Sequence, residues 1–128
     1  MNDDSPLPIG ELELRAIAMP ANTNPNGDIF GGWLVSQMDL AGYAAASKLA
    51  GGRVATVAID RMSFMVPVAV GAVVSCYCEV INTGRSSIEV AVEVWVNPPT
   101  EHTAVKVTEG IFIYVAIDDN GRTRRLKG

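Results

Sequence analysis

The stretch "NTNPNGDIFGGWLVSQMDLAG" (residues 22–42) begins as a polar turn and continues as an apolar helix. Asparagine, proline and glycine fill its first part, which is typical of a loop. The pair Gly31–Gly32 then opens a helix that we expect to run from about Gly32 to Ala50, before a second glycine pair. One acid, Asp39, follows Gly32 by seven residues and lies among leucine, methionine, alanine and glycine. A carboxylate in such a setting needs a partner or a function.

The segments around this helix have the pattern of strands. They cover residues 11–19, 54–66, 72–81, 86–96 and 104–117, and turn-forming residues connect them. In the last segment Glu109 falls on the apolar face, and Gly110 beside it predicts a bulge that turns the acid away. The pattern predicts an α+β fold with one long helix packed on an antiparallel sheet of about five strands. A chain of 128 residues forms one domain, here residues 1–128 with flexible tails at 1–10 and 119–128.

Composition and charge exclude several classes of function. Ten basic and 14 acidic residues give a net charge of −4, so nonspecific binding of nucleic acid is not expected. The first residues, "MNDDSPLP", lack the basic and apolar regions of a secretory signal. No apolar run approaches the roughly 18 residues that cross a bilayer. We therefore expect a cytoplasmic protein that does not insert into membranes.

The two cysteines, Cys76 and Cys78, are separated by one residue within a predicted strand. On a strand they point to the same face, where such close neighbours rarely form a disulfide. No third cysteine exists, and the single histidine, His102, is distant in sequence, so a zinc site is unsupported. We predict buried, reduced core thiols.

The predicted helix has two apolar faces. One faces the sheet and consists of Leu34, Met38, Ala41, Ala45 and Leu49. Trp33, Leu40 and Tyr43 form a second patch, and we expect another copy of the chain to cover it. Asp39 then lies at the interface between subunits. Two interpretations of this position are open: Asp39 is a structural residue that forms hydrogen bonds across the interface, or it is the reactive carboxylate of an enzyme.

The diglycine favours the second interpretation. The first N–H groups of a helix are unpaired and lie at the positive end of its dipole. Without side chains, Gly31 and Gly32 let a carbonyl approach these donors, as in an oxyanion hole, although a tight turn alone also explains them. Gly32 and Asp39 are roughly 10 Å apart along the helix, too far to serve one carbonyl carbon. Two antiparallel copies of the helix would bring the amides of one near the carboxylate of the other.

At these residues the chain resembles a known family. The segments "MPANTNPNGDIFGGWLVSQMDLAG", "GRVATVAIDRMSFMVPVAVG", "VAVEVWV" and "YVAIDDNGRTRRL" are similar to those of the YciA-type acyl-CoA thioesterases, which are hotdog-fold enzymes related to the brain acyl-CoA hydrolase. The resemblance covers about residues 12–126. It implies a long central helix wrapped by a curved sheet, homodimers with two composite sites, and usually trimers of dimers. It also implies hydrolysis of acyl-CoA to a carboxylic acid and CoA.

The resemblance also implies roles for single residues. Asp39 matches the catalytic acid, acting as general base or as nucleophile. Asn24 matches the asparagine that completes the site from the other subunit, although an asparagine before proline is also a common turn residue. Gly32, together with Gly31, matches the amide donors to the thioester oxygen, and Thr56 matches a polar residue of the pocket. No metal or cofactor is required, because CoA is part of the substrate.

Three arginines are candidates for contacts with the CoA phosphates. Arg53, Arg61 and Arg85 carry the required charge, and the basic segment "RTRRLK" makes the end of an acidic chain locally positive. For any one of them, a solvated surface position is the simpler interpretation.

Two other functions compete with hydrolysis. A non-catalytic acyl-CoA-binding domain would keep the diglycine and the pocket without needing a carboxylate at Asp39. A hydratase or dehydratase on the same fold would need a histidine near the helix, whereas His102 lies in the loop "NPPTEHT".

Overall fold

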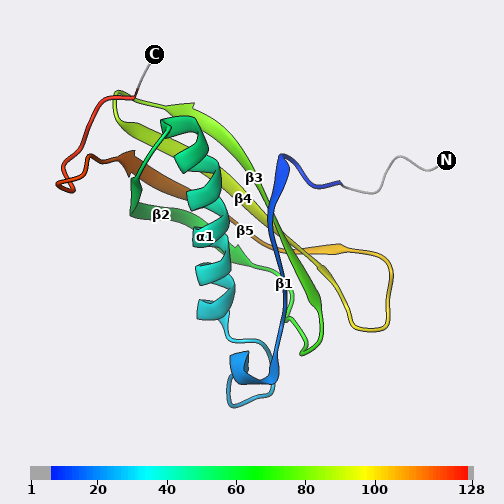
Figure 1. The fold of residues 1–128 in the computed structure, drawn as a ribbon. Helices are drawn as coiled ribbons and strands as arrows, with labels where there is room; N and C mark the ends of the chain where they lie inside the picture. The colour runs from blue at the N-terminus through cyan, green and yellow to red at the C-terminus, as the bar shows by residue number, and fades with distance from the viewer. Residues whose placement is uncertain (1–6, 127–128) are drawn as a thin grey trace.

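The computed structural model describes residues 7–126, which form one sheet with a single long helix on one of its faces (Figure 1). In chain order the elements are β1 (Glu11–Ile17), the short 3-10 helix η1 (Pro20–Asn22), α1 (Gly31–Ala50), β2 (Val54–Phe64), β3 (Val73–Thr83), β4 (Ser87–Asn97) and β5 (Val105–Ala116). The predicted helix and five strands are confirmed, with small differences at their ends. None of the helices within these residues combines the length and apolarity that crossing a bilayer requires.

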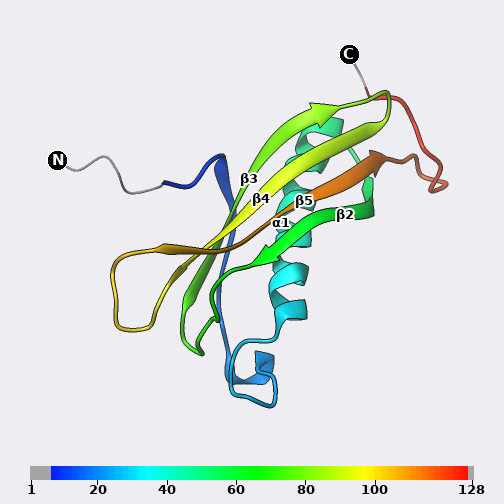
Figure 2. The ribbon, with the colours of Figure 1, turned by 180° about the vertical axis from the view of Figure 1, so that it is seen from behind.

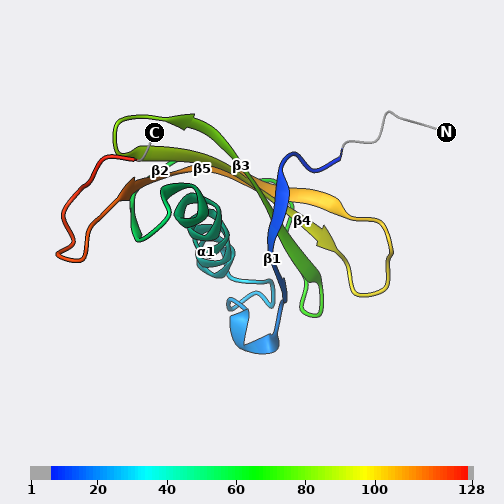
Figure 3. The same ribbon diagram turned by 45° about the horizontal axis from the view of Figure 1, so that its top comes forward.

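The five strands follow the order β1-β3-β4-β5-β2, and every neighbouring pair is antiparallel. β1 and β2 are therefore the two edges of the sheet. The sheet curves around α1, which is seen nearly end-on on its inner side in Figure 3. Viewed from behind, the strands lie in front of the helix, and no helix within residues 7–126 covers this outer face (Figure 2).

Strand alternation places the core between α1 and the middle strands. The inward residues of β4 are all buried, as the pattern predicts: Ile88, Val90, Val92, Val94 and Val96. Trp95 points to the outer face and is still only 4% exposed. Its Nε1 donates a hydrogen bond to Glu93 Oε1 (2.9 Å), and the amide of Ile9 donates to the same oxygen (3.2 Å). The segment before β1 therefore folds back toward the outer face of β4.

The bulge that turns Glu109 outward lies three residues before the predicted position. Val94 pairs with Thr108 and Trp95 with Lys106, so Val107 is the extra residue of β5. The pairing with β2 is also irregular at Gly110, but there the extra residue belongs to β2, where Arg61 and Met62 face Gly110. The prediction that Gly110 itself forms the bulge of β5 was therefore wrong. Gly110 is buried, and a Cβ there would lie 3.0 Å from the Cε of Met62. Glu109 is exposed, as expected.

The buried stripe of α1 is turned relative to the predicted one. It consists of Leu34, Met38, Ala41, Gly42, Ala46 and Ala50, whereas Leu49, which we expected inside, is 49% exposed. α1 packs against all five strands, and Gly42 in its buried stripe lies against Tyr114 on β5. Asp39 consequently lies at the margin of the buried stripe and faces the strands.

Part of the predicted C-terminal tail is packed on the domain. α1 ends at Gly51, which is left-handed with φ 67°. Nη2 of Arg124 donates a hydrogen bond to the carbonyl of Ala50 (2.9 Å), and the amide of Leu126 donates to that of Arg85 (2.8 Å). The remaining parts of the predicted tails, residues 1–6 and 127–128, lie outside the described residues.

The thiols of Cys76 and Cys78 lie buried and reduced on the inner face of β3, as predicted. Burial raises the pKa of each thiol from 9.0 to about 12. We therefore expect Ellman's reagent at pH 8 to leave both thiols of the folded protein unmodified and to label both in guanidinium chloride, because thiolate is the reacting form. Rapid labelling of the folded protein would contradict this burial. The same property makes the reagent suitable for measuring released CoA.

Candidate active site

The carboxylate of Asp39 is held by two strands of its own subunit. Thr56 Oγ1, on β2, donates a hydrogen bond to Asp39 Oδ1 (2.7 Å). The hydroxyl of Tyr114, on β5, lies 3.0 Å from the same oxygen and 2.8 Å from the main-chain oxygen of Asp39. Thr56 and Tyr114 are partners in the β2–β5 pairing, so the sheet fixes both donors together. Asp39 thus has partners within the chain, and one carboxylate oxygen receives both.

Tyr114 is a site residue that the sequence analysis missed. Burial, followed by the nearby Asp39 carboxylate, raises the pKa of its hydroxyl above the ordinary value, so the group stays protonated and acts as a donor. Two signals for it are visible in the sequence. A tyrosine on the buried face of a strand needs a hydrogen-bond partner, and Gly42 weakens the helix one turn after Asp39 for no local reason.

The first turn of α1 offers two unpaired N–H groups. Phe30 precedes the helix without a capping side chain, and its carbonyl accepts hydrogen bonds from the amides of Trp33 and Leu34. Within residues 7–126 the amides of Gly31 and Gly32 have no acceptor. A Cβ at Gly31 would meet only the Phe64 ring, at 3.8 Å, so the subunit itself does not require glycine there. Both amides are therefore available to an oxygen from outside the helix.

Asn24 is a turn residue that keeps one functional group free. Its Oδ1 accepts hydrogen bonds from the amides of Asn26 (2.9 Å) and Asp28 (3.1 Å), and its main-chain amide donates to the carbonyl of Asp28 (2.8 Å). The structure gives Nδ2 no acceptor among residues 7–126. The turn interpretation is thus correct for Oδ1, and the side chain is held so that its N–H groups remain available as donors.

These groups form two separate clusters within one subunit. Asn24 and Gly31 line the same pocket at the start of α1, together with Phe64, and Asp39 does not reach it. Asp39, with Thr56, lies about 12 Å further along the helix axis than Gly31. One carbonyl carbon cannot be served by both clusters of the same chain. If both clusters act on one carbonyl carbon, the second cluster has to come from another subunit.

The three candidate arginines lie in two different places within one subunit. Arg53 follows α1 and donates two hydrogen bonds (3.2 Å each) to the carbonyls of Asp118 and Asp119. Arg85 lies in the turn between β3 and β4 and is tied through its carbonyl to Leu126. Both therefore lie near the C-terminal end of the helix and retain exposed side chains.

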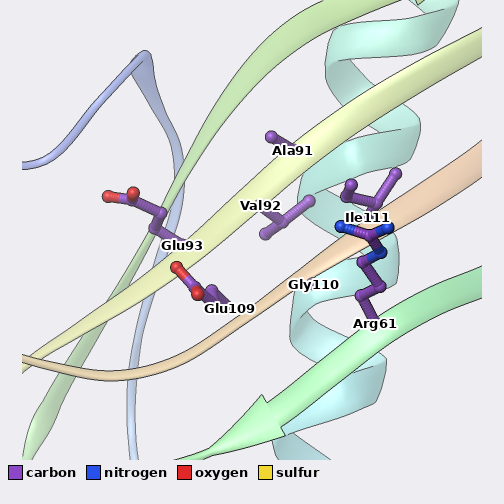
Figure 4. A pocket seen from close by; sticks show the side chains of 7 residues that line it. All are labelled: Arg61, Ala91, Val92, Glu93, Glu109, Gly110 and Ile111. Atoms are coloured by element: carbon purple, nitrogen blue, oxygen red, sulfur yellow. The ribbon is translucent and has the colours of Figure 1, made fainter.

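Arg61 lies elsewhere, on the face of the sheet turned away from α1 (Figure 4). It occupies an irregular part of β2 with a left-handed φ of 53°. Glu93 and Glu109 line the same pocket, and Lys106 forms an ion pair with each of these carboxylates. His102 is also remote: it lies in the loop between β4 and β5, which projects beyond the body of the sheet (Figure 1).

Comparisons with known proteins identify the family. The sequence profile of the thioesterase superfamily matches residues 26–102. The acyl-CoA thioester hydrolase YciA of Salmonella typhimurium is 52% identical over 122 residues, which cover 93% of this chain and 92% of that protein. The chain belongs to the YciA family. This membership confirms the resemblance found in the sequence and the hotdog architecture of one helix on a five-stranded antiparallel sheet.

Solved structures of relatives superpose closely on this YciA-family chain. The hexameric thioesterase y2039 from Yersinia pestis has a TM-score of 0.92 and 55% identity, over 95% of this chain and 99% of that one. The acyl-CoA hydrolase from Staphylococcus aureus has been solved as an asparagine-to-alanine variant (TM-score 0.84) and as an aspartate-to-alanine variant (TM-score 0.81). Both are 26% identical to this chain over 90% of its length, which corresponds to 69% and 71% of theirs.

Proposed function

We propose that the protein hydrolyses the thioester bond of acyl-CoA, releasing a carboxylic acid and free CoA, at sites shared between two subunits. The observation that carries this proposal is the state of Asp39. Two hydroxyl groups fix its Oδ1, while Oδ2 has no partner among the described residues and lies at the margin of the helix. A carboxylate with one fixed and one free oxygen is suited to react with a substrate or a water molecule.

The amides of Gly31 and Gly32 supply the complementary part of the reaction. They donate to the thioester oxygen, and this contact strengthens as negative charge develops there. Asp39 then takes a proton from an attacking water molecule, or its Oδ2 attacks the carbonyl carbon to form an anhydride that water opens. In both routes the C–S bond breaks, and the sulfur leaves as thiolate and is protonated. In this proposal Asn24 Nδ2 donates a hydrogen bond to the water or to the acyl oxygen.

Pairing of two subunits along β2 would complete each site. The edge strand β2 and the outer side of α1 expose apolar residues, including Leu40 (57%) and Phe64 (53%), as expected of a surface that another chain covers. Tyr43 is exposed beside them, whereas Trp33, expected in the same patch, is partly buried. We infer a homodimer as the minimal active unit and a trimer of such dimers. The hexameric state of the Yersinia pestis relative supports this assembly.

A spacing in a relative supports the roles of Asn24 and Asp39. The asparagine and the aspartate replaced by alanine in the two Staphylococcus aureus variants are separated by the same number of positions as Asn24 and Asp39. Asn24 would contribute to one site of the dimer and Asp39 to the other. Thr56 acts on Asp39 through its hydrogen bond, and no metal or cofactor enters the reaction.

The proposal is tested by measuring free thiol with Ellman's reagent after adding acyl-CoAs of short, medium and long chain. We expect turnover of at least one chain length by a protein that light scattering identifies as a hexamer. Acyl-CoA binding without thiol release at any chain length would support the non-catalytic binding domain instead. The hydrogen bonds that orient Asp39 favour the enzyme, because binding alone does not need an oriented carboxylate.

A further inference from the structure

The hydroxyl of Tyr114 contacts both the side chain and the main chain of Asp39. It lies 3.0 Å from Oδ1 and 2.8 Å from the main-chain oxygen, so its single proton is shared between two acceptors. Thr56 adds a second donor to Oδ1 at 2.7 Å. Because both donors meet the same oxygen, rotation of the carboxylate about its bond to Cβ would break both contacts. The pair therefore determines where Oδ2 lies.

Gly42 makes the approach of this hydroxyl possible. Gly42 lies one turn after Asp39 on the buried stripe of α1. A Cβ at Gly42 would overlap the Tyr114 hydroxyl oxygen and lie 3.0 Å from its Cζ. Any larger residue would therefore push the hydroxyl away from Asp39. A glycine in mid-helix weakens the helix, so its presence here is explained by the space that it leaves.

We propose that Tyr114 is a positioning residue, which acts through Asp39 and, in the space left by Gly42, holds Oδ2 in the orientation required for attack. This inference rests on the proposed role of Asp39. Reaction rates respond steeply to the geometry of the reacting group, and a misplacement of about 1 Å can cost about 100-fold. Thr56 shares the task from β2, and Tyr114 additionally ties the helix backbone at Asp39 to β5.

A purely structural role for Tyr114 makes different predictions. Its ring is fully buried and stacks with Phe112 at a centroid distance of 6.5 Å. Phenylalanine in its place keeps this ring and its packing, and it removes only the hydroxyl. The substitution Tyr114→Phe therefore separates positioning of the carboxylate from filling of the core.

For Tyr114→Phe we expect kcat to fall between about 10-fold and about 100-fold, with little change in KM or in the hexamer. Tyr77→Phe is the matched control, because Tyr77 lies on β3, which is separated from β2 by two strands, and its hydroxyl does not contact Asp39. Its kcat should equal that of the wild type. An unchanged kcat in Tyr114→Phe, or an equal loss in both variants, would overturn the inference.

Combined variants test whether Tyr114 acts through Asp39. In an Asp39→Asn background, Tyr114→Phe should cause no further loss of residual activity, whereas a merely structural role would add its own loss. Gly42→Ala should lower kcat as Tyr114→Phe does, because its Cβ would overlap the Tyr114 hydroxyl oxygen. Additive losses of Asp39→Asn and Tyr114→Phe would contradict the proposed coupling.

Substitutions of Thr56 provide a further test that does not disturb the core. Thr56→Ser keeps a hydroxyl and should retain most of kcat, whereas Thr56→Val should lose about 10-fold or more. Equal rates in these two variants would contradict positioning through Oδ1.

Failure of this inference is distinguishable from failure of the proposed function. If Asp39→Ala is inactive and Tyr114→Phe is fully active, only the inference fails, whereas an active Asp39→Ala enzyme removes the catalytic role itself.

Discussion

Replacement of Asp39 by alanine is expected to lower kcat by about 10²- to 10⁴-fold, the usual contribution of a general base. A comparable loss is expected for Asp39→Asn, which keeps the shape of the side chain and the acceptor for Thr56 and Tyr114. The asparagine neither takes a proton from water nor attacks a thioester efficiently. The measurement is thiol release over a range of acyl-CoA concentrations, which separates kcat from KM.

Assembly and binding are the controls for these variants. The carboxylate is half-buried and meets its partners at the margin of the helix, so both variants should remain hexameric and should still bind CoA. Residual turnover from the glycine amides and from substrate binding is expected. A correctly assembled Asp39→Ala hexamer with the wild-type rate would remove Asp39 from the mechanism.

Mixing Asp39→Ala subunits with Asn24→Ala subunits is expected to restore activity that neither variant has alone. In a heterodimer, the first chain supplies an intact Asn24 and the second an intact Asp39, so one site is complete and the other lacks both groups. Random pairing in equal amounts makes half of the dimers mixed, which corresponds to about one quarter of the wild-type activity. The two chains are refolded together, or they are co-expressed with different tags.

A mixture of Asp39→Ala with Asp39→Asn subunits is the matched control and should stay inactive, because no pairing restores the carboxylate. The mixture of Asn24→Ala and Asp39→Ala subunits could also stay inactive even though mixed dimers are recovered through both tags. In that case each site would lie within one chain. That result would contradict the shared site and would leave hydrolysis itself untouched.

Much of the fold follows from local patterns. The helix is marked by glycine pairs at both ends, and the buried face of β4 follows from the alternation between Ile88 and Val96. β2 is different: its burial does not alternate, because it is an edge strand interrupted at two points of its pairing with β5. The rotation of the helix stripe was likewise invisible in the sequence, since it depends on how far the sheet curves around α1.

The candidate site likewise has one part that the sequence predicts and another part that it does not. Asn24, Gly31, Gly32 and Asp39 belong to one continuous stretch. The residue types single out Asp39 and the diglycine but leave a structural interpretation open, and the role of Asn24 is implied only by the resemblance to the thioesterase family. The groups that hold the carboxylate come from Thr56 and Tyr114, which are 17 and 75 positions from Asp39 along the chain. Within the helix, Gly42 signals only that something approaches closely, and it does not say which residue does. They are set by the antiparallel register of β2 and β5, which places the two residues opposite each other.

The interval between Gly31 and Asp39 has a consequence for how this protein can evolve. A rigid helix fixes both the rise between two residues and the angle between their side chains. One inserted residue would lengthen the interval by about 1.5 Å and swing Asp39 around the axis by about 100°. In the proposed twofold dimer, a single such event would disable both centres at once. Loops such as the one that carries His102 can change length freely, whereas this part of α1 is expected to keep its length in every functional descendant.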